Sequence, residues 1–244
     1  QMWSMLSFDF GNSDTTGRPV KEIFAEGALP SLMITLPAFV VGCSVAIALS
    51  LYLMFMRQSV IDLWATIFCV ALMSVPAMVY IIVGQYVVAQ NFNLLPVFGF
   101  SFSGADRVRF LLLPVTLMIV SRLGAEVLLY RGLFGDEATQ DYVRTARAKG
   151  ASNSQVLFVH VLKNGLINLI TVIVSALPML IMGSLLIENF FGIPGLGNVL
   201  VTAIQSSDFN VVQGSVFFGS ILYIIGLLLT DLCYAWADPR IRLS

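Results

Sequence analysis

The sequence predicts an all-α protein, a polytopic bundle of membrane-spanning helices that forms one integral domain over residues 1–244. Of the 244 residues, 58% are hydrophobic and 11% are charged, and the mean hydropathy is +0.89. This composition is too apolar for an ordinary soluble domain. Five apolar runs are long enough to cross a bilayer, because a spanning helix needs about 20 residues. These runs cover about 30–56, 64–90, 109–131, 166–188 and 213–236.

Prolines lie inside the first four runs, at Pro37, Pro76, Pro114 and Pro178. Membrane helices tolerate proline where neighbouring helices or Ser and Thr side chains satisfy the freed carbonyl groups. We therefore expect kinks at these positions. No feature of the sequence divides the five runs into separate domains.

Residues 1–29 are interpreted as a polar loop on the outer side of the membrane, because they include Gly11, Asn12, Asp14 and Gly17. The sequence begins with Gln and has neither the basic start nor the apolar core of a signal peptide. A sixth span, N-terminal to this sequence, is expected to deliver the loop to the outer side.

Charge and cysteine content exclude several classes of protein. The formal net charge of −1 argues against a nucleic-acid-binding protein, which would show a basic face. Cys43, Cys69 and Cys233 lie in apolar runs and have only His160 to join them, so no metal site, cofactor or disulfide framework is expected. The sequence has no Walker-type loop with Lys-Ser/Thr, so ATP hydrolysis is expected in a partner and not in this chain.

The distribution of basic residues predicts the orientation. If residues 132–165 form a cytoplasmic loop, the C-terminus is cytoplasmic as well, and more Lys and Arg residues lie inside than outside, as the positive-inside rule requires. The inner cations would be Arg57, Arg131, Arg144, Arg147, Lys149, Lys163, Arg240 and Arg242, and the outer ones Arg18, Lys21, Arg107 and Arg109.

The loop at 132–165 contains signals for two short helices joined by a turn. Ser152 and Gln155 fit a capping box, so a helix is expected to start there and to run through the apolar residues 156–161. Gly150 precedes this cap and is free to take a positive φ. An apolar surface on such a loop predicts that another chain covers it. The alternative is that the segment lies on the membrane or packs under the protein's own spans.

The segment DYVRTARAKGASNSQVLFVHVLKNG, residues 141–165, resembles the cytoplasmic "EAA" loop of binding-protein-dependent ABC importer permeases. Its RTARAKG form, residues 144–150, resembles the oligopeptide, dipeptide and nickel branch, as in its B-type subunits. Three more segments resemble this branch, in matching order: 9–13 (DFGNS), 188–197 (ENFFGIPGLG) and 238–242 (DPRIR). The glycines of the second are expected to form a tight re-entrant turn at the outer face.

The resemblance implies the type I importer permease fold and a coupling role for the loop, which would seat in a groove of a cytoplasmic ATPase subunit. It assigns this role to Arg144, Ala146, Lys149, Gly150, Ser152, Gln155, Val156, Leu157, Phe158 and His160. Arg144 and Thr145 stand where the family motif opens with Glu-Ala. A contact that depends on that Glu therefore does not transfer to this chain.

The resemblance also implies the partners and the place of action. They are two cytoplasmic ABC ATPase subunits, a second homologous permease and an extracytoplasmic solute-binding protein, in a bacterial inner membrane. The implied function is import of oligopeptides, dipeptides or a related solute by alternating access.

Three charged residues are candidates for the translocation pathway: Arg122, Glu126 and Glu188. Arg122 and Glu126 are four apart in one span, and an unpaired charge near the bilayer centre costs about 2.5–3.5 kcal/mol, so a pair is expected. The pair would either line the pathway or lock helices together as a structural ion pair. Glu188 lies at the outer end of its span and is expected to be hydrated there, with a gating or helix-capping role as the alternative.

Two other classes of function would require different residues in the spans. A transporter or channel driven by an ion gradient would need buried carboxylates, for which Glu126 is the only credible candidate. An intramembrane enzyme would need a Ser/Lys, Ser/His or two-Asp pair or an HExxH site in its spans, and the sequence has none of these.

Overall fold

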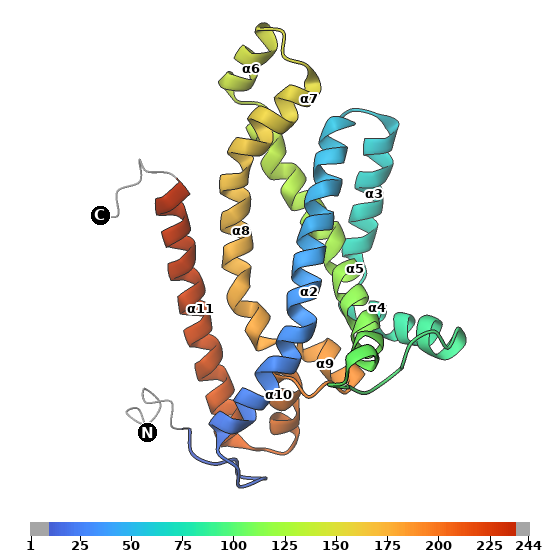
Figure 1. The fold of residues 1–244 in the computed structure, drawn as a ribbon, viewed down its shortest axis with the longest axis vertical. Helices are drawn as coiled ribbons and strands as arrows, with labels where there is room; N and C mark the ends of the chain where they lie inside the picture. Colours follow the sequence, from blue (N-terminus) through green and yellow to red (C-terminus); the bar gives the residue numbers. More distant parts are fainter. Residues whose placement is uncertain (1–9, 238–244) are drawn as a thin grey trace. The chain divides into compact units, whose positions relative to one another are not determined.

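The computed structural model describes residues 10–237, and within this range the chain is built from helices (Figure 1). The helices in the first half are α2 (Val20–Phe55), α3 (Val60–Ser74), α4 (Ala77–Gly84), the π-helix η1 (Gln85–Asn91) and α5 (Gly104–Glu137). Those in the second half are α6 (Asp141–Ala148), α7 (Asn153–Gln155), the π-helix η2 (Val156–Val161), α8 (Leu162–Met182), α9 (Leu185–Phe191), α10 (Leu196–Gln205) and α11 (Phe209–Ala237). The predicted all-α class is confirmed.

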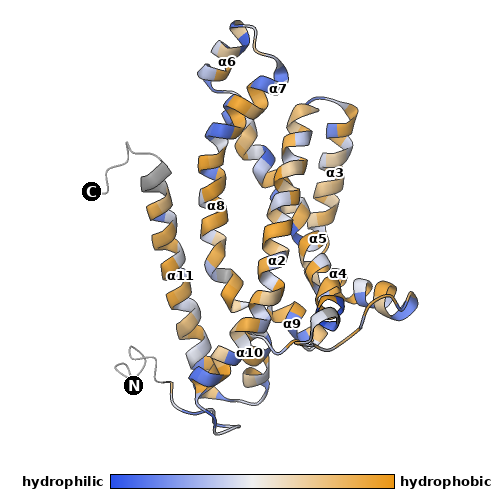
Figure 2. Cartoon of the chain, viewed as in Figure 1, coloured by the Kyte–Doolittle hydropathy of each residue, from blue (hydrophilic) through white to orange (hydrophobic). Residues whose placement is uncertain are grey.

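Among residues 10–237, four helical stretches are long and apolar enough to cross a membrane: Val20–Phe55, Asp106–Glu137, Asn153–Phe191 and Phe209–Cys233. The number of candidate spans rises to five if the bent pair Val60–Ser74 and Ala77–Asn91 forms one span. Figure 2 shows the apolar character of these helices along their length. Each of the five predicted runs coincides in position with one of these stretches.

The first long helix begins at Val20, ten residues before the predicted span, so part of the predicted outer loop is helical. Pro19 stands directly before the first helical residue, where its fixed φ and missing N–H suit a helix start. Glu22 in the first turn adds a favourable interaction with the helix dipole. The helix accommodates both Pro30 and Pro37.

Two of the predicted runs are interrupted rather than kinked. Between α3 and α4, Val75 has an extended backbone, the conformation that a following proline imposes, and Pro76 then opens the next helix. Between α8 and α9, Gly183 takes a φ of 73° in the left-handed region. Pro178 lies inside α8 without ending it.

Backbone packing divides the chain into two compact units that cut across the long helices. The first unit is formed by the chain up to residue 39 together with 77–118 and 176–227, and the second by 40–76, 119–175 and the chain from 228. In the first unit, Ile34, Ile81, Leu113, Phe191 and Ile193 are among the buried apolar residues of one cluster, and Val20, Phe24, Leu196 and Val211 are among those of another.

The second unit carries the predicted coupling loop. Its core joins Val127, Tyr130 and Phe134 of α5 to residues of α2, α6, η2 and α8. Helix α6 and η2 therefore belong to a packed core and do not form a free loop.

Candidate functional site

Helix α6 forms because its sequence satisfies both ends and one face. Gln140 precedes it with an extended backbone, Asp141 lies in the first turn and Arg147 in the last, so both charges favour the helix dipole. Val143 and Ala146 face the core and are 1% and 8% exposed, whereas Arg144 on the other face is exposed. The helix thus presents a polar surface and is held by an apolar one.

A glycine ends α6, as the sequence predicted. Gly150 has a φ of 86°, and its N–H donates to the Arg147 carbonyl at 3.0 Å. The next N–H, that of Ala151, donates to the Ala146 carbonyl at 3.1 Å. These two bonds form a Schellman motif, which satisfies the last carbonyls of a helix and reverses the chain.

The predicted capping box is present. The Ser152 hydroxyl accepts the N–H of Gln155 at 3.3 Å, and the Gln155 side-chain oxygen accepts the N–H of Ser152 at 3.0 Å. The helix that starts here does not remain short, however. Helices α7, η2 and α8 follow one another without a gap from Asn153 to Met182, so the cap opens a membrane-length helix.

The apolar segment of η2 has two different faces. Val156, Leu157 and Val161 are 3%, 6% and 1% exposed and pack into the chain's own core, whereas Phe158 and Val159 are 54% and 55% exposed. The prediction that another chain covers this whole segment is therefore wrong for Val156, Leu157 and Val161, because the chain's own core covers them. The remaining exposed apolar surface consists of Phe158 and Val159.

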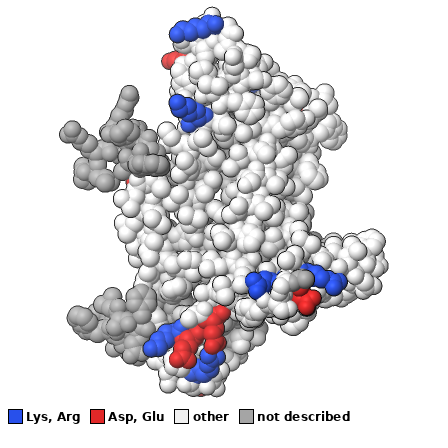
Figure 3. Space-filling view, viewed as in Figure 1, with Lys and Arg blue, Asp and Glu red and all other residues white. Residues whose placement is uncertain are grey.

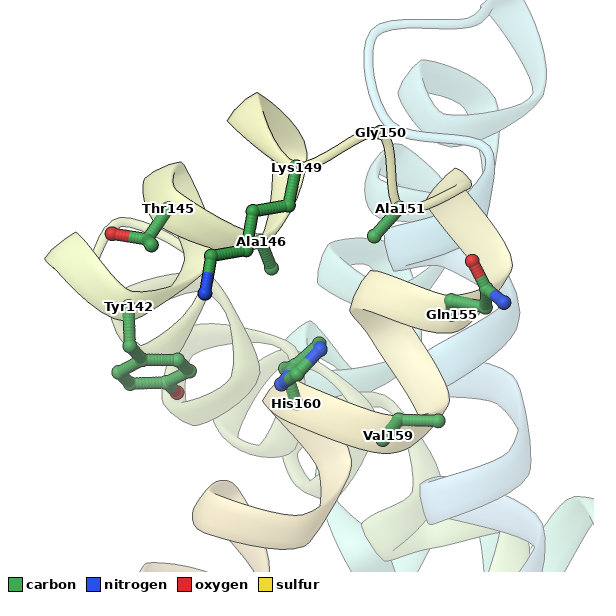
Figure 4. A pocket seen from close by; sticks show the side chains of 9 residues that line it. All are labelled: Tyr142, Thr145, Ala146, Lys149, Gly150, Ala151, Gln155, Val159 and His160. Carbon is green, nitrogen blue, oxygen red and sulfur yellow. The ribbon is translucent and has the colours of Figure 1, made fainter.

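A hollow of about 580 Å³ opens between α6 and η2 (Figure 4). It is lined by Tyr142, Thr145, Ala146, Lys149, Gly150, Ala151, Gln155, Val159 and His160. Five of the predicted coupling residues line the hollow: Ala146, Lys149, Gly150, Gln155 and His160. Ser152 and Phe158 are exposed beside it. Figure 3 shows Lys and Arg atoms on the surface over this part of the chain.

Glu137, an acidic residue five positions before Tyr142, is already engaged. The Tyr142 hydroxyl donates to the Glu137 carboxylate at 2.6 Å. Burial, together with this hydrogen bond, raises the pKa of Tyr142 to about 12. Tyr142 is therefore a neutral hydrogen-bond donor at physiological pH.

The predicted pair of Arg122 and Glu126 is present in α5. The Arg122 Nε lies 3.0 Å from the Glu126 Oε1, and the two side chains are 48% and 15% exposed. Glu126 is thus mostly covered while its partner reaches outward.

Glu188, expected to be hydrated, is instead fully buried in the first unit. Its carboxylate accepts hydrogen bonds from the Ser31 hydroxyl at 2.8 Å, the Ser184 N–H at 3.0 Å and the Asn198 N–H at 3.1 Å. Ser184 and Asn198 lie at the N-terminal ends of α9 and α10, so the carboxylate satisfies donors of two helix starts. This arrangement is the helix-capping alternative.

The glycines around this carboxylate explain part of the ENFFGIPGLG motif. A Cβ atom added at Gly183 or Gly195 would overlap the Glu188 side chain. Gly192 has a φ of 65° and ends α9 in a second left-handed turn, which agrees with the predicted tight turn. The motif therefore leaves space for a buried acid.

Two polar clusters were not predicted from the sequence. Asp62 and Arg131 pair at 2.8 Å in the second unit, with side chains 9% and 25% exposed, and Arg131 also donates to Thr66 at 3.1 Å. A signal for Asp62 was available, since Ser59 and Asp62 have the spacing of a helix cap and Ser59 does accept the Asp62 N–H. Arg131 had been counted only as a loop cation.

The second missed cluster surrounds Asp208 on the segment before α11. Asp208 is 1% exposed and accepts hydrogen bonds from Ser13, from the Thr15 hydroxyl at 2.9 Å and from the Val211 N–H at 3.2 Å. Burial alone would raise the pKa of Asp208, but these bonds and the Asp14 N–H outweigh it and lower the pKa to about 2.

Two predicted features fall outside the described residues. They are Asp9, the first residue of the DFGNS segment, and the whole of the DPRIR segment, residues 238–242, which includes the predicted inner cations Arg240 and Arg242.

A sequence profile for "Binding-protein-dependent transport system inner membrane component" matches residues 38–243. The chain belongs to this family. Membership makes the chain a multi-pass permease of the inner membrane and implies ATPase and solute-binding partners. It supports the interpretation of the chain as an ABC importer permease and not as a transporter driven by an ion gradient.

Similar proteins agree with this permease assignment. A putative peptide transport system permease of Brucella abortus (strain 2308) is 32% identical over 99% of this chain and 78% of its own length. The dipeptide transport system permease DppB of Bacillus subtilis is 31% identical over 98% of this chain and 77% of its own length. A solved structure, an amino acid ABC transporter with histidines, has a TM-score of 0.65 at 15% identity and covers 99% of both chains. That likeness shows that this permease has the ABC transporter permease fold.

Proposed function

We propose that this permease imports peptides by alternating access and that the element α6–Gly150–η2, residues 141–161, receives the ATP-driven movement. One observation carries the proposal: the element is fixed to the chain's own core on one side and exposes Phe158 and Val159 on the other. Exposed aromatic and aliphatic side chains beside a hollow are typical of a docking surface.

The predicted coupling residues divide into two roles on this proposal. Exposed residues contact the ATPase, and they are Arg144, Lys149, Gly150, Ser152, Gln155 and Phe158, with the half-buried His160 at the hollow. Buried residues fix the geometry of that surface, and they are Ala146, Val156 and Leu157. The coupling surface is thus smaller than the whole motif.

The proposed assembly contains two ATPase subunits, a second homologous permease and an extracytoplasmic solute-binding protein. The C-terminus and the α6–η2 end lie in the cytoplasm, in agreement with the excess of cations on that side. Closure of the ATPases would move α6 and, through the hydrogen-bonded helix that begins at Asn153, the membrane part of the chain.

Peptide cargo is proposed from the names of the relatives, which are peptide and dipeptide permeases. In this proposal the Arg122–Glu126 pair flanks the pathway, because Arg122 remains 48% exposed within a span and so is available to a wet cavity. Glu188 is assigned a positioning role at the start of α10, since its carboxylate is saturated with donors and has no exposure to cargo.

The test is site-specific photocrosslinking in the assembled transporter. A photoreactive amino acid at Phe158 or Val159 is expected to crosslink to an ATPase subunit. The same amino acid at Leu228, which is 57% exposed on α11, is the matched control and is expected to give no such product. An ATPase that co-purifies with the permease but never crosslinks from 158 or 159 would contradict the proposed coupling surface.

Cargo is tested by uptake in proteoliposomes. ATP-dependent accumulation of a labelled dipeptide or oligopeptide, with the solute-binding protein present, is the expected result. Uptake that follows a proton gradient and ignores ATP would contradict it.

A further inference from the structure

The hollow between α6 and η2 has the chemistry of a site for a single acidic side chain, and this inference rests on the proposed docking of an ATPase. Its floor is made of small apolar groups, those of Ala146, Ala151 and Val159. Lys149 and His160 supply nitrogen atoms to its lining, and no carboxylate lines it.

The basic group at the hollow has no acidic partner within the described residues. The ion pairs of the second unit join Arg122 to Glu126, Arg131 to Asp62 and Arg144 to Asp141, and none includes Lys149. Glu137, which lies close by in sequence, is occupied by the Tyr142 hydroxyl. In Figure 4 the Lys149 side chain turns from the end of α6 toward the space flanked by Tyr142 and His160.

We propose that the hollow binds a Glu or Asp side chain of the ATPase subunit, with the carboxylate at Lys149 and His160 and the methylene stem on the apolar floor. Charge-assisted hydrogen bonds from an ammonium group to a carboxylate are short and strong, and they fix register at an interface. The position where the family motif carries an acid is Arg144 here, and Arg147 and Lys149 follow it in the same segment. We therefore expect an acidic group on the ATPase surface that faces the hollow.

The floor favours a protein carboxylate over a lipid phosphate. A single methylene or ethylene stem fits against Ala146, Ala151 and Val159, and the hollow adjoins the exposed Phe158 that the same partner would cover. Membrane attachment through anionic lipid is the competing outcome, and the experiment separates the two.

The experiment measures association of the ATPase subunits with the permease complex in nanodiscs of zwitterionic lipid, for wild type and for Lys149→Glu and Lys149→Gln. Lys163→Glu is the matched control, because it makes the same change of charge at an exposed lysine of the second unit that neither lines the hollow nor belongs to the proposed coupling surface. Lys149→Glu is expected to weaken association at least about tenfold and Lys149→Gln by less, whereas Lys163→Glu changes it by no more than about twofold. Among Glu→Lys and Asp→Lys variants of the ATPase, one is expected to restore binding to Lys149→Glu.

Three results would overturn the inference. Equal effects of Lys149→Glu and Lys163→Glu would show general attraction without a site, and association unchanged by Lys149→Glu would show that the hollow binds no carboxylate. A Lys149→Glu defect that appears only as lost binding to anionic-lipid vesicles would assign the hollow to lipid. Failure of wild type to bind any ATPase would instead remove the proposed function, so the two failures are distinguishable. Lys149 is exposed, and an unchanged melting temperature of each variant confirms that folding is intact.

Discussion

The Ser31 hydroxyl donates a 2.8 Å hydrogen bond to the Glu188 carboxylate, although 157 residues separate the two. The same Ser31 oxygen accepts the N–H of Leu196 at 2.8 Å. One hydroxyl therefore connects α2, α9 and the first turn of α10 within the first unit. The arrangement makes Glu188 the acceptor on which the two short helices depend.

Replacing Glu188 by Ala is expected to lower the free energy of unfolding by about 2–4 kcal/mol, since it leaves buried donors without an acceptor. Glu188→Gln retains one acceptor oxygen but turns an amide N–H₂ toward a donor, so its loss is expected to be smaller. Thermal unfolding in detergent should rank wild type above Gln and Gln above Ala. Equal stability of wild type and Glu188→Ala would contradict the capping role.

Replacing Gly150 by Ala is expected to weaken coupling, because φ at this residue is 86° and an alanine there is strained by about 1 kcal/mol. No atom lies within 4 Å of an added Cβ, so the effect would come from the backbone alone. The measurement is ATP hydrolysis stimulated by the solute-binding protein. Gly135→Ala in α5 is the control, since it has equal space, no positive φ, and an expected neutral or slightly stabilising effect.

Breaking the Asp62–Arg131 pair from one side is expected to cost about 3–5 kcal/mol, because a mostly buried charge loses its partner. The double variant Asp62→Asn, Arg131→Gln should lose less than the sum of the two single variants. A double-mutant cycle on chemical or thermal unfolding measures the coupling. Strict additivity would show that the two side chains do not stabilise each other.

Asp208 predicts a dependence on acid pH. Its folded pKa of about 2 lies below the ordinary aspartate value of about 3.9, so its stabilising effect is present above pH 4 and is lost as pH falls from about 4 to about 2. Hydrogen exchange of the Asp14 and Thr15 amides should be slow in wild type at neutral pH and fast in Asp208→Asn. The two proteins should converge near pH 2, and a difference that persists there would refute the assignment.

Tyr142 predicts a dependence on alkaline pH. Its folded pKa of about 12 lies above the ordinary value of about 10, so the contribution of the neutral hydroxyl is complete below pH 10 and is lost as pH rises through 12. The ultraviolet difference spectrum between wild type and Tyr142→Phe should contain one tyrosine that ionises near pH 12. An ionisation near pH 10 would show that the Glu137 contact is absent in solution.

Local signals in the sequence were sufficient to predict the turn between α6 and α7. Ser152 and Gln155 are three residues apart and satisfy each other, and Gly150 ends α6 through bonds to carbonyls no more than five residues away. Such features depend on nearby residues alone, and for this reason spacing predicts them.

Features set by distant residues could not be predicted from the sequence. In the apolar run 156–161, the sequence pattern does not distinguish the buried Val156 and Leu157 from the exposed Phe158. Which of them is buried depends on helices from distant parts of the sequence that pack against this run. Glu188 was expected in water for the same reason, since its partner Ser31 is remote in sequence. The break at Pro76 was predicted only as a kink, and the break at Gly183 was not predicted. Proline and glycine in a membrane helix are compatible with a straight helix, a kink or a break.

The anchoring of η2 by Val156, Leu157 and Val161 has an entropic consequence. In the proposed docking, a surface that already holds its bound shape loses little conformational freedom when the ATPase binds, so more of the contact energy remains as affinity. A movement of the ATPase would then displace α8 directly, because η2 is packed into the core and continues into that helix.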